Sequence, residues 1–139
     1  MAVTVLEGLD GIRAAAGSQL GHSDWWQIDE EQVRRFAAAT GAPEAVDDVV
    51  PPLLLLALTN RFLPEIVEVR GVALGVNYGT GAVRFPAPLP VGARVRGVAE
   101  LTEVADIDGG VQTTMRITVE VEGGDEPAAV VDALSRWLR

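Results

Sequence analysis

The chain has 139 residues, of which 48% are hydrophobic and 22% charged, a composition typical of one folded globular domain. Twenty acidic residues against eleven basic ones give a net charge of −9, which repels phosphate backbones and anionic membrane surfaces. We therefore expect neither nucleic acid nor a membrane as a partner. The chain has no cysteine and a single histidine, His22, which excludes thiolate sites and argues against a metal site.

The first 41 residues carry signals for two helices and a short strand. Apolar residues recur at helical spacing over residues 6–16 and stop at Gly17, which predicts a short N-terminal helix. The aromatic segment 23–28 predicts a short strand or extended entry. Asp29 stands in a capping-box-like pattern, and the apolar face that follows it predicts a second helix that ends at Gly41.

The next segment is the most apolar part of the chain. Pro51 and Pro52 open the run Leu53–Leu63, whose leucines favour a helix rather than a strand. A helix that is apolar on nearly every side must be wrapped by other elements. The longest apolar stretch, residues 49–58, is too short to span a bilayer, and the N-terminus has no secretion signal, so we expect a cytoplasmic protein.

From Ile66 onward, β-branched residues alternate with turn signals. The predicted strands are residues 66–78, 82–85, 94–104, 111–121 and 128–138, with turns at residues 79–81, 108–110 and 123–124. Over residues 111–121 apolar and polar residues alternate with a period of two, which predicts one buried and one wet face. The residues alone therefore predict an α+β domain in which an antiparallel sheet of four or five strands covers a buried helix.

One stretch points to a known family. Residues 77–79 read Asn-Tyr-Gly, and residues 84–92 read Arg-Phe-Pro-Ala-Pro-Leu-Pro-Val-Gly. This stretch resembles the MaoC-like, or (R)-specific enoyl thioester hydratase, family of hot-dog proteins. The resemblance implies one hot-dog domain over residues 1–139, with a long apolar helix wrapped by about five antiparallel strands. It also implies a homodimer formed by edge-to-edge pairing of sheets, and it calls for no cofactor and no metal.

The same resemblance implies catalytic elements that this chain lacks. Family members carry an Asp after a Thr-Gly pair and a His on the next loop, whereas here Ala42 follows Thr40 and Gly41 and no His lies between Ala42 and the apolar helix. The family's His-Gly at the start of that helix falls on Pro51 and Pro52, and proline has no N–H to donate to a thioester oxygen. Losing one general acid or base typically removes about 10²–10⁴ in rate. We therefore do not expect ordinary enoyl thioester hydration.

Three residues are candidates for a substitute catalytic role: Asp47, Asp48 and Tyr78. The two aspartates lie in the shortened loop before the apolar helix, where either could replace the lost carboxylate. The alternative is that one of them caps that helix. Tyr78 lies on the strand that passes near the family's substrate tunnel, and its alternative is a buried tyrosine with a local partner. His22 has a surface or turn role in our interpretation.

The candidates for substrate binding are Asn77, Asn60, Thr59, Leu54 and Trp26. Asn77 shares the Asn-Tyr-Gly strand, and its amide can donate a hydrogen bond to a ligand. Thr59 and Asn60 interrupt the apolar helix, so they either face a ligand cavity or mark the end of the helix. Leu54 belongs to that helix, and Trp26 is alternatively a core or interface anchor.

These features leave three functional hypotheses. The first is an enzyme on a MaoC-like scaffold that acts on a hydrophobic small molecule or a polyketide-type acyl intermediate, by elimination, isomerisation or cyclisation. The second is a catalytically silent hot-dog subunit, or a small-molecule binding module, that partners an active MaoC-like protein. The third is a hydratase or dehydratase acting on an acyl thioester with relocated acidic residues.

Overall fold

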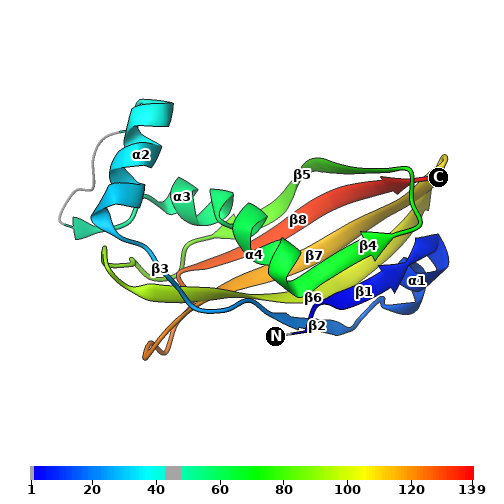
Figure 1. Cartoon of the computed structure of the whole chain (residues 1–139), viewed down its shortest axis with the longest axis horizontal. Helices are drawn as coiled ribbons and strands as arrows, with labels where there is room; N and C mark the ends of the chain where they lie inside the picture. Colours follow the sequence, from blue (N-terminus) through cyan, green and yellow to red (C-terminus); the bar gives the residue numbers. More distant parts are fainter. Residues whose placement is uncertain (1, 43–47) are drawn as a thin grey trace.

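The structure, a computed structural model, describes residues 2–42 and 48–139 and consists of one large curved sheet, a separate two-stranded sheet and four short helices (Figure 1). The helices are α1 (Gly8–Ala14), α2 (Glu30–Thr40), α3 (Pro52–Ala57) and α4 (Thr59–Ile66). The strands are β1 (Thr4–Glu7), β2 (Gln19–His22), β3 (Trp26–Gln27), β4 (Val67–Arg70), β5 (Leu74–Arg84), β6 (Arg94–Ile107), β7 (Gly110–Val121) and β8 (Ala129–Leu138).

The main sheet has six strands in the order β2-β6-β7-β8-β5, with the two-residue strand β3 also paired to β6. Every pair in this sheet is antiparallel. The expected α+β class, with an antiparallel sheet around apolar helices, is confirmed, and the sheet has six strands where about five were expected. β5 forms one edge of the sheet, since its only partner is β8.

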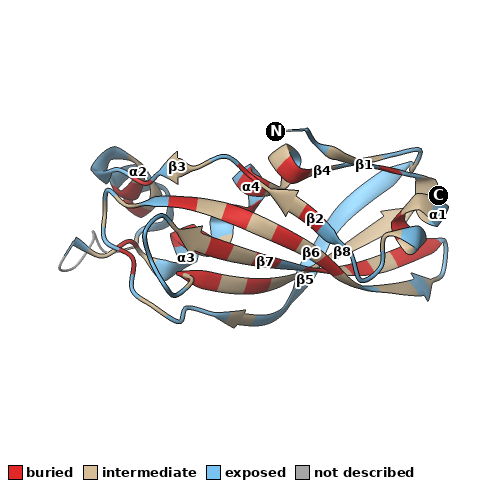
Figure 2. Ribbon diagram, turned by 90° about the horizontal axis from the view of Figure 1, so that it is seen from below, coloured by how far each residue is buried: buried red, intermediate tan, exposed pale blue. Residues whose placement is uncertain are grey.

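The three central strands show the predicted separation of a buried and a wet face (Figure 2). Along β7, Met115, Ile117 and Val119 are buried, whereas Arg116 between them is exposed. Their side chains alternate because successive residues of a strand point to opposite faces. The predicted hairpin between β6 and β7 is also confirmed: Ile107 pairs with Gly110, and the loop residue Gly109 has a φ of 80°.

Helix α4 packs on the concave face, where it contacts β6 and β2. Phe62 is fully buried and lies against Gly97 of β6. The buried Ser23 makes two hydrogen bonds with Gly97. Its N–H donates to the Gly97 carbonyl (2.9 Å), and its hydroxyl accepts from the Gly97 N–H (2.9 Å). The core therefore centres on the contact between α4 and β6.

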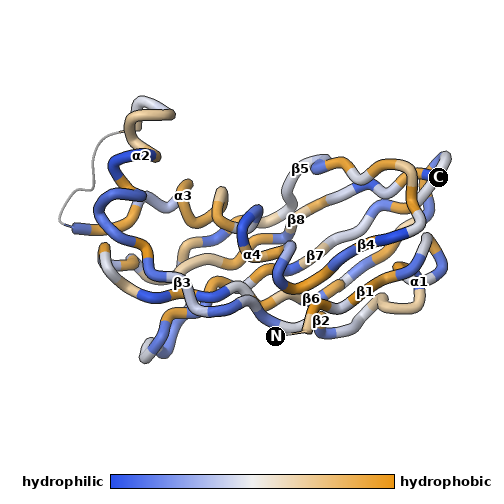
Figure 3. The backbone as a smooth tube through the Cα atoms, viewed as in Figure 1, coloured by the Kyte–Doolittle hydropathy of each residue, from blue (hydrophilic) through white to orange (hydrophobic). Residues whose placement is uncertain are grey.

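The expected single long helix over residues 53–63 is wrong, because the segment forms two short helices, α3 and α4, with Leu58 between them. The Thr59 hydroxyl donates to the carbonyl of Leu56 (2.8 Å), the group that would otherwise accept from the N–H of Asn60 in a continuous helix. Leu58 itself keeps a right-handed helical conformation (φ −67°, ψ −13°), so the two helices follow one another directly. Figure 3 shows the apolar character of α3 beside the hydrophilic start of α2.

The N-terminal segment also differs from its prediction. Residues 4–7 form β1, which pairs in parallel with β4, and the helix starts only at Gly8. Gly8 has a φ of 66°, a left-handed conformation that ends the strand and that glycine adopts without strain. The helix then ends at Ala14, before the predicted Gly17.

The predicted strand over residues 66–78 is divided, and the turn predicted at residues 79–81 is absent. β4 ends at Arg70, Gly71 turns the chain with a φ of 72°, and β5 then runs without a break from Leu74 to Arg84. The two glycines of the predicted turn are accommodated as irregularities in the pairing with β8, between Asn77 and Gly79 and between Thr80 and Val83.

Helix α2 begins and ends as predicted. The Asp29 carboxylate accepts a hydrogen bond from the N–H of Gln32 (2.9 Å), and Gly41 closes the helix in the left-handed region. Within the segment 23–28, only Trp26 and Gln27 form a strand. In the described part of the chain, no helix has the length and apolar character needed to cross a membrane.

Candidate functional site

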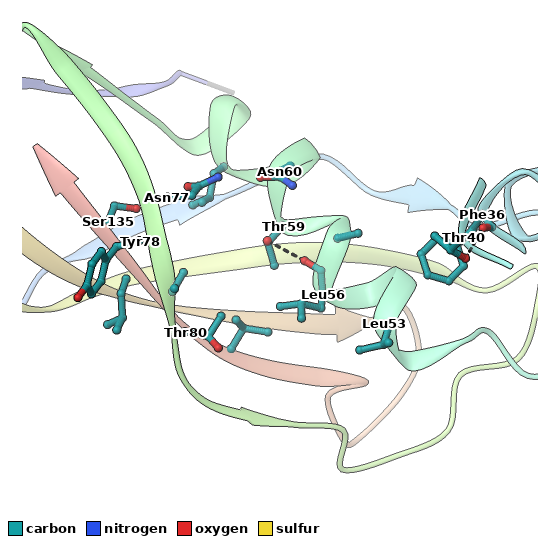
Figure 4. A pocket seen from close by; sticks show the side chains of 16 residues that line it. Phe36, Thr40, Leu53, Leu56, Thr59, Asn60, Asn77, Tyr78, Thr80 and Ser135 are labelled. Carbon is teal, nitrogen blue, oxygen red and sulfur yellow. Dashed lines mark hydrogen bonds between the residues drawn. The ribbon is translucent and has the colours of Figure 1, made fainter. Parts of the chain in front are cut away.

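A groove of about 580 Å³ lies between the α3–α4 segment and the strands β5 and β8. The helices contribute mainly apolar side chains to it, and the end of α2 closes one side with Phe36 and Thr40. Figure 4 shows the labelled residues around the groove. The full lining is Phe36, Thr40, Leu53, Leu56, Ala57, Thr59, Asn60, Leu63, Asn77, Tyr78, Gly79, Thr80, Val131, Ala133, Leu134 and Ser135.

The floor of the groove follows from the register of β8. Ser135 pairs with the buried Thr113 of β7, and Ala133 pairs with the buried Met115, so both point toward the helices. These two side chains are small, and the next residue of that face, Trp137, is large. Small residues between the sheet and the helices leave the space that a ligand can fill.

The indole of Trp137 lies over Gly75, its partner across β8 and β5. This pair lies two residues along the strands from the pair Asn77 and Ser135. A Cβ atom on Gly75 would be 2.5 Å from Cζ3 of Trp137, so glycine is required for this contact. The Trp137 indole N–H donates to the Thr113 hydroxyl (3.0 Å), which satisfies that buried group.

The polar groups of the groove fall into two sets. The hydroxyls of Thr59 and Thr40 donate to helix carbonyls, at Leu56 and Phe36 respectively. The side chains of Asn60, Asn77, Thr80 and Ser135 make no hydrogen bond with any described residue, although each lines the groove. The second set is therefore available to a ligand.

Tyr78 lines the groove, but its ring points away from Thr59 and Asn60 in Figure 4. It stacks on the guanidinium of Arg136, with 3.6 Å between Cζ and the ring centroid. Tyr78 is 54% exposed, so the alternative of a buried tyrosine is wrong, while its local partner is Arg136. A catalytic role for Tyr78 remains a prediction.

The other two apolar or aromatic candidates lie outside the groove. Leu54 is buried in the core, and Trp26 is half-buried against the same core. The guanidinium of Arg61 stacks on the Trp26 ring, with 3.4 Å between Cζ and the ring centroid. The indole N–H of Trp26 donates to the side-chain oxygen of Gln32 (3.0 Å). Trp26 therefore links α4 to α2, as the alternative of a core anchor implied.

Of the two candidate aspartates, Asp47 lies outside the described residues. Asp48 is exposed, has a φ of 57°, and accepts a hydrogen bond at its main-chain oxygen from the N–H of Val91 (2.7 Å). Its carboxylate neither lines the groove nor makes a hydrogen bond with a described residue, so it does not cap α3.

The start of α3 offers few backbone donors. Pro51 and Pro52 have no N–H, and the N–H of Leu54 donates to the Pro51 carbonyl (3.0 Å). Of residues 51–54, only Leu53 therefore has a backbone N–H that is available to a ligand.

No carboxylate, imidazole or amine lines the groove among the described residues. The described groups with a shifted pKa belong to exposed ion pairs elsewhere: hydrogen bonds from Arg34 and Arg35 lower the pKa of Glu31, and a hydrogen bond from Arg70 lowers the pKa of Glu68. Asp106, Glu68 and Asp132 raise the pKa of their partner arginines in the same way. Perturbed titratable groups, the usual mark of an acid or base catalyst, are therefore absent from the described groove.

Within residues 2–42 and 48–139, no three potential ligands among His, Asp and Glu side chains lie close enough together to hold a metal ion. His22 is part-buried on β2, and its Nδ1 lies 2.9 Å from the Ser23 carbonyl, away from the groove.

The sequence predicted four groove residues, Thr59, Asn60, Asn77 and Tyr78, and missed the rest. Ser135 could have been found only from the strand register, which places it opposite Asn77.

Comparison with known proteins identifies the scaffold. The chain is 39% identical to 3-hydroxyacyl-thioester dehydratase Z of Mycobacterium tuberculosis, over 95% of this chain and 97% of that protein. The chain belongs to the MaoC-like dehydratase family of hot-dog proteins. The aligned region spans 146 positions, more than the 139 residues of this chain, so the relative carries residues that this MaoC-like protein lacks. No family model matches.

Solved structures confirm the hot-dog fold. The MaoC-like dehydratase from Rhodospirillum rubrum superposes with a TM-score of 0.71 at 16% identity, over 90% of this chain and 93% of that one. The HadBC (3R-hydroxyacyl-ACP dehydratase) complex from Mycobacterium tuberculosis superposes with a TM-score of 0.69 at 17% identity, over 87% of this chain and 96% of that one.

Proposed function

We propose that this MaoC-like protein binds a hydrophobic small molecule or an acyl or polyketide-type intermediate in the groove, and promotes an elimination, isomerisation or cyclisation. The observation that carries the proposal is the groove itself: its walls are largely apolar, and no described lining side chain is a carboxylate or an imidazole. Such a site orients a hydrophobic molecule by its shape, and in this proposal one of the candidate catalytic residues Asp47, Asp48 and Tyr78 carries the proton that an elimination or isomerisation moves.

Hydration of an enoyl thioester needs a general base and acid around a water molecule. Ala42 stands after Thr40 and Gly41, and the prolines at the start of α3 remove amide donors. Losing an oxyanion donor typically costs about 10²–10³ in rate in addition to the loss of the base. These features argue against hydration by the family's usual residues, whereas the 39% identity to 3-hydroxyacyl-thioester dehydratase Z supports a dehydratase role.

The test is an assay of purified protein with crotonyl thioester, beside an active MaoC-like dehydratase as the positive control. We expect no hydration above the uncatalysed rate. Robust hydration that is abolished by D47N or D48N would instead establish a hydratase with relocated acidic residues.

A second candidate function is a catalytically silent subunit, and the edge strand favours it. β5 is eleven residues long, pairs on one side only, and has just one charged residue, Arg84. Long uncharged edges favour pairing with another strand. We infer that β5 forms the interface of a homodimer or of a pair with another hot-dog chain, as the HadBC complex is a pair.

Co-expression separates the two functions. A silent partner would co-purify with an active MaoC-like dehydratase and raise its activity, whereas an enzyme would transform its own ligand alone. Turnover of a hydrophobic acyl substrate by the isolated protein would exclude the silent role.

A further inference from the structure

We propose that the groove selects an uncharged ligand whose polar end carries a carbonyl, amide or hydroxyl group, and that Asn60, Asn77 and Ser135 hold this end. The inference rests on the proposed function, since it assumes that the groove binds a hydrophobic molecule. The inference adds which end of the groove binds the polar head of that molecule, and which chemical groups the head can carry.

The three side chains come from three different elements. Asn60 lies on α4, Asn77 on the edge strand β5, and Ser135 on β8. Asn77 and Ser135 are directly paired across the strands, so their side chains point to the same face of the sheet. Figure 4 shows Asn60 beside Asn77, on the side opposite Ser135.

The opposite end of the groove is largely apolar, and the hydroxyl of Thr40, which lies there beside Phe36, already donates to the Phe36 carbonyl (2.7 Å). In Figure 4, Phe36 and Leu53 lie at the far end from Asn77 and Ser135, and Leu56 and Ala57 line the helix side. A ligand with a polar head and an apolar tail therefore matches the groove better in one direction, because the reverse direction would exchange three unpaired polar side chains for mainly apolar ones.

The polar end is neutral. The chain has two asparagines, Asn60 and Asn77, and both line this groove without a side-chain hydrogen bond to any described residue. A carboxamide offers two donors and an acceptor, so two of them can bind a ketone, an amide or a hydroxyl group. Neither they nor Ser135 can neutralise a carboxylate.

The nearby arginines are engaged elsewhere. Arg61 of α4 stacks on Trp26, and Arg136 of β8 stacks on Tyr78 and donates to Gln112 (3.0 Å). Neither arginine lines the groove. A carboxylate placed between Asn60 and Asn77 would lose water without gaining a cation, in a protein whose net charge is already −9.

The test compares two probes of equal chain length, octanamide and octanoate, by isothermal titration calorimetry at pH 7.5. We expect octanamide to bind at least about tenfold more tightly than octanoate, since the uncompensated charge is the main difference. N60L and N77L should each weaken octanamide binding by about fivefold, the typical loss of one hydrogen bond, and leave octanoate nearly unchanged. T118V, on the wet face of β7, is the matched control and should leave both affinities unchanged.

The outcomes separate this inference from the proposed function. Equal binding of the two probes would overturn the head-group selectivity and leave the apolar groove standing. A preference for octanamide that survives both asparagine substitutions would overturn the assignment to these residues. Failure of both probes to bind the wild-type protein would overturn the proposed function as well.

Discussion

The side chain of Phe62 lies against the backbone of Gly97, at the point where α4 meets β6. A Cβ atom on Gly97 would lie 2.7 Å from the Cβ of Phe62, closer than real Cβ contacts allow. The absence of a side chain at this one strand position therefore sets how closely the helix approaches the sheet.

We expect G97A to lower the free energy of unfolding by about 1–3 kcal/mol, the usual cost of overpacking a core. Urea denaturation followed by circular dichroism measures the change. G79A is the control, because a Cβ on Gly79 meets no atom within 4 Å, and its φ is outside the left-handed region. Equal effects of the two substitutions would show that α4 does not depend on this contact.

Octanamide binding should not change between about pH 5.5 and 8.5. The reason is that no described groove residue is a carboxylate, an imidazole or an amine, the groups that ordinarily titrate near or within this range. Titration calorimetry at several pH values measures it. A sigmoidal or bell-shaped dependence would mean that an ionisable group outside the described lining, such as Asp47, reaches the ligand.

The ion pairs of Glu31 should stabilise the protein only above acidic pH. Hydrogen bonds from Arg34 and Arg35 lower its pKa below the ordinary value of 4.5, so the folded state favours the charged form. That stabilisation is present above the ordinary pKa and is lost as the pH falls through the lowered folded-state pKa. The Tm difference between wild type and E31Q should therefore shrink below about pH 4.5 and vanish in stronger acid. A Tm difference between wild type and E31Q that grows as the pH falls would contradict this prediction.

A charge on the β5 edge should weaken self-association. We expect the wild type to sediment as a dimer and V76K to raise the dimer dissociation constant by at least about tenfold, because a lysine on an edge opposes strand pairing. V5K is a matched control, since Val5 on β1 and Val76 on β5 are both 39% exposed. A monomeric wild type, or equal effects of V76K and V5K, would exclude β5 as the interface.

The sequence predicted those elements that depend on local signals. The cap at Asp29 predicted the start of α2, and the alternation along residues 111–121 predicted β7 and its buried face. The hairpin at Asp108 and Gly109 followed from turn chemistry. Each of these signals lies within a few residues of the structure that it predicts.

The features that the sequence did not predict depend on contacts between distant segments. Pairing with β8 keeps residues 79–81 in a strand despite their two glycines, and pairing with β4 places Leu6 and Glu7, predicted as helical, in β1. Ser135 enters the groove only through its register opposite Asn77.

Residues 77–80 form a wall of the groove and also belong to the free edge of the sheet. If a second strand pairs with that edge, it restrains the backbone that holds Asn77, so occupation of the groove and assembly of subunits become linked equilibria. Reciprocity then requires that a ligand which tightens assembly is itself bound more tightly by the assembled form, by the same factor. Ligand affinity would consequently depend on the concentration of the protein itself.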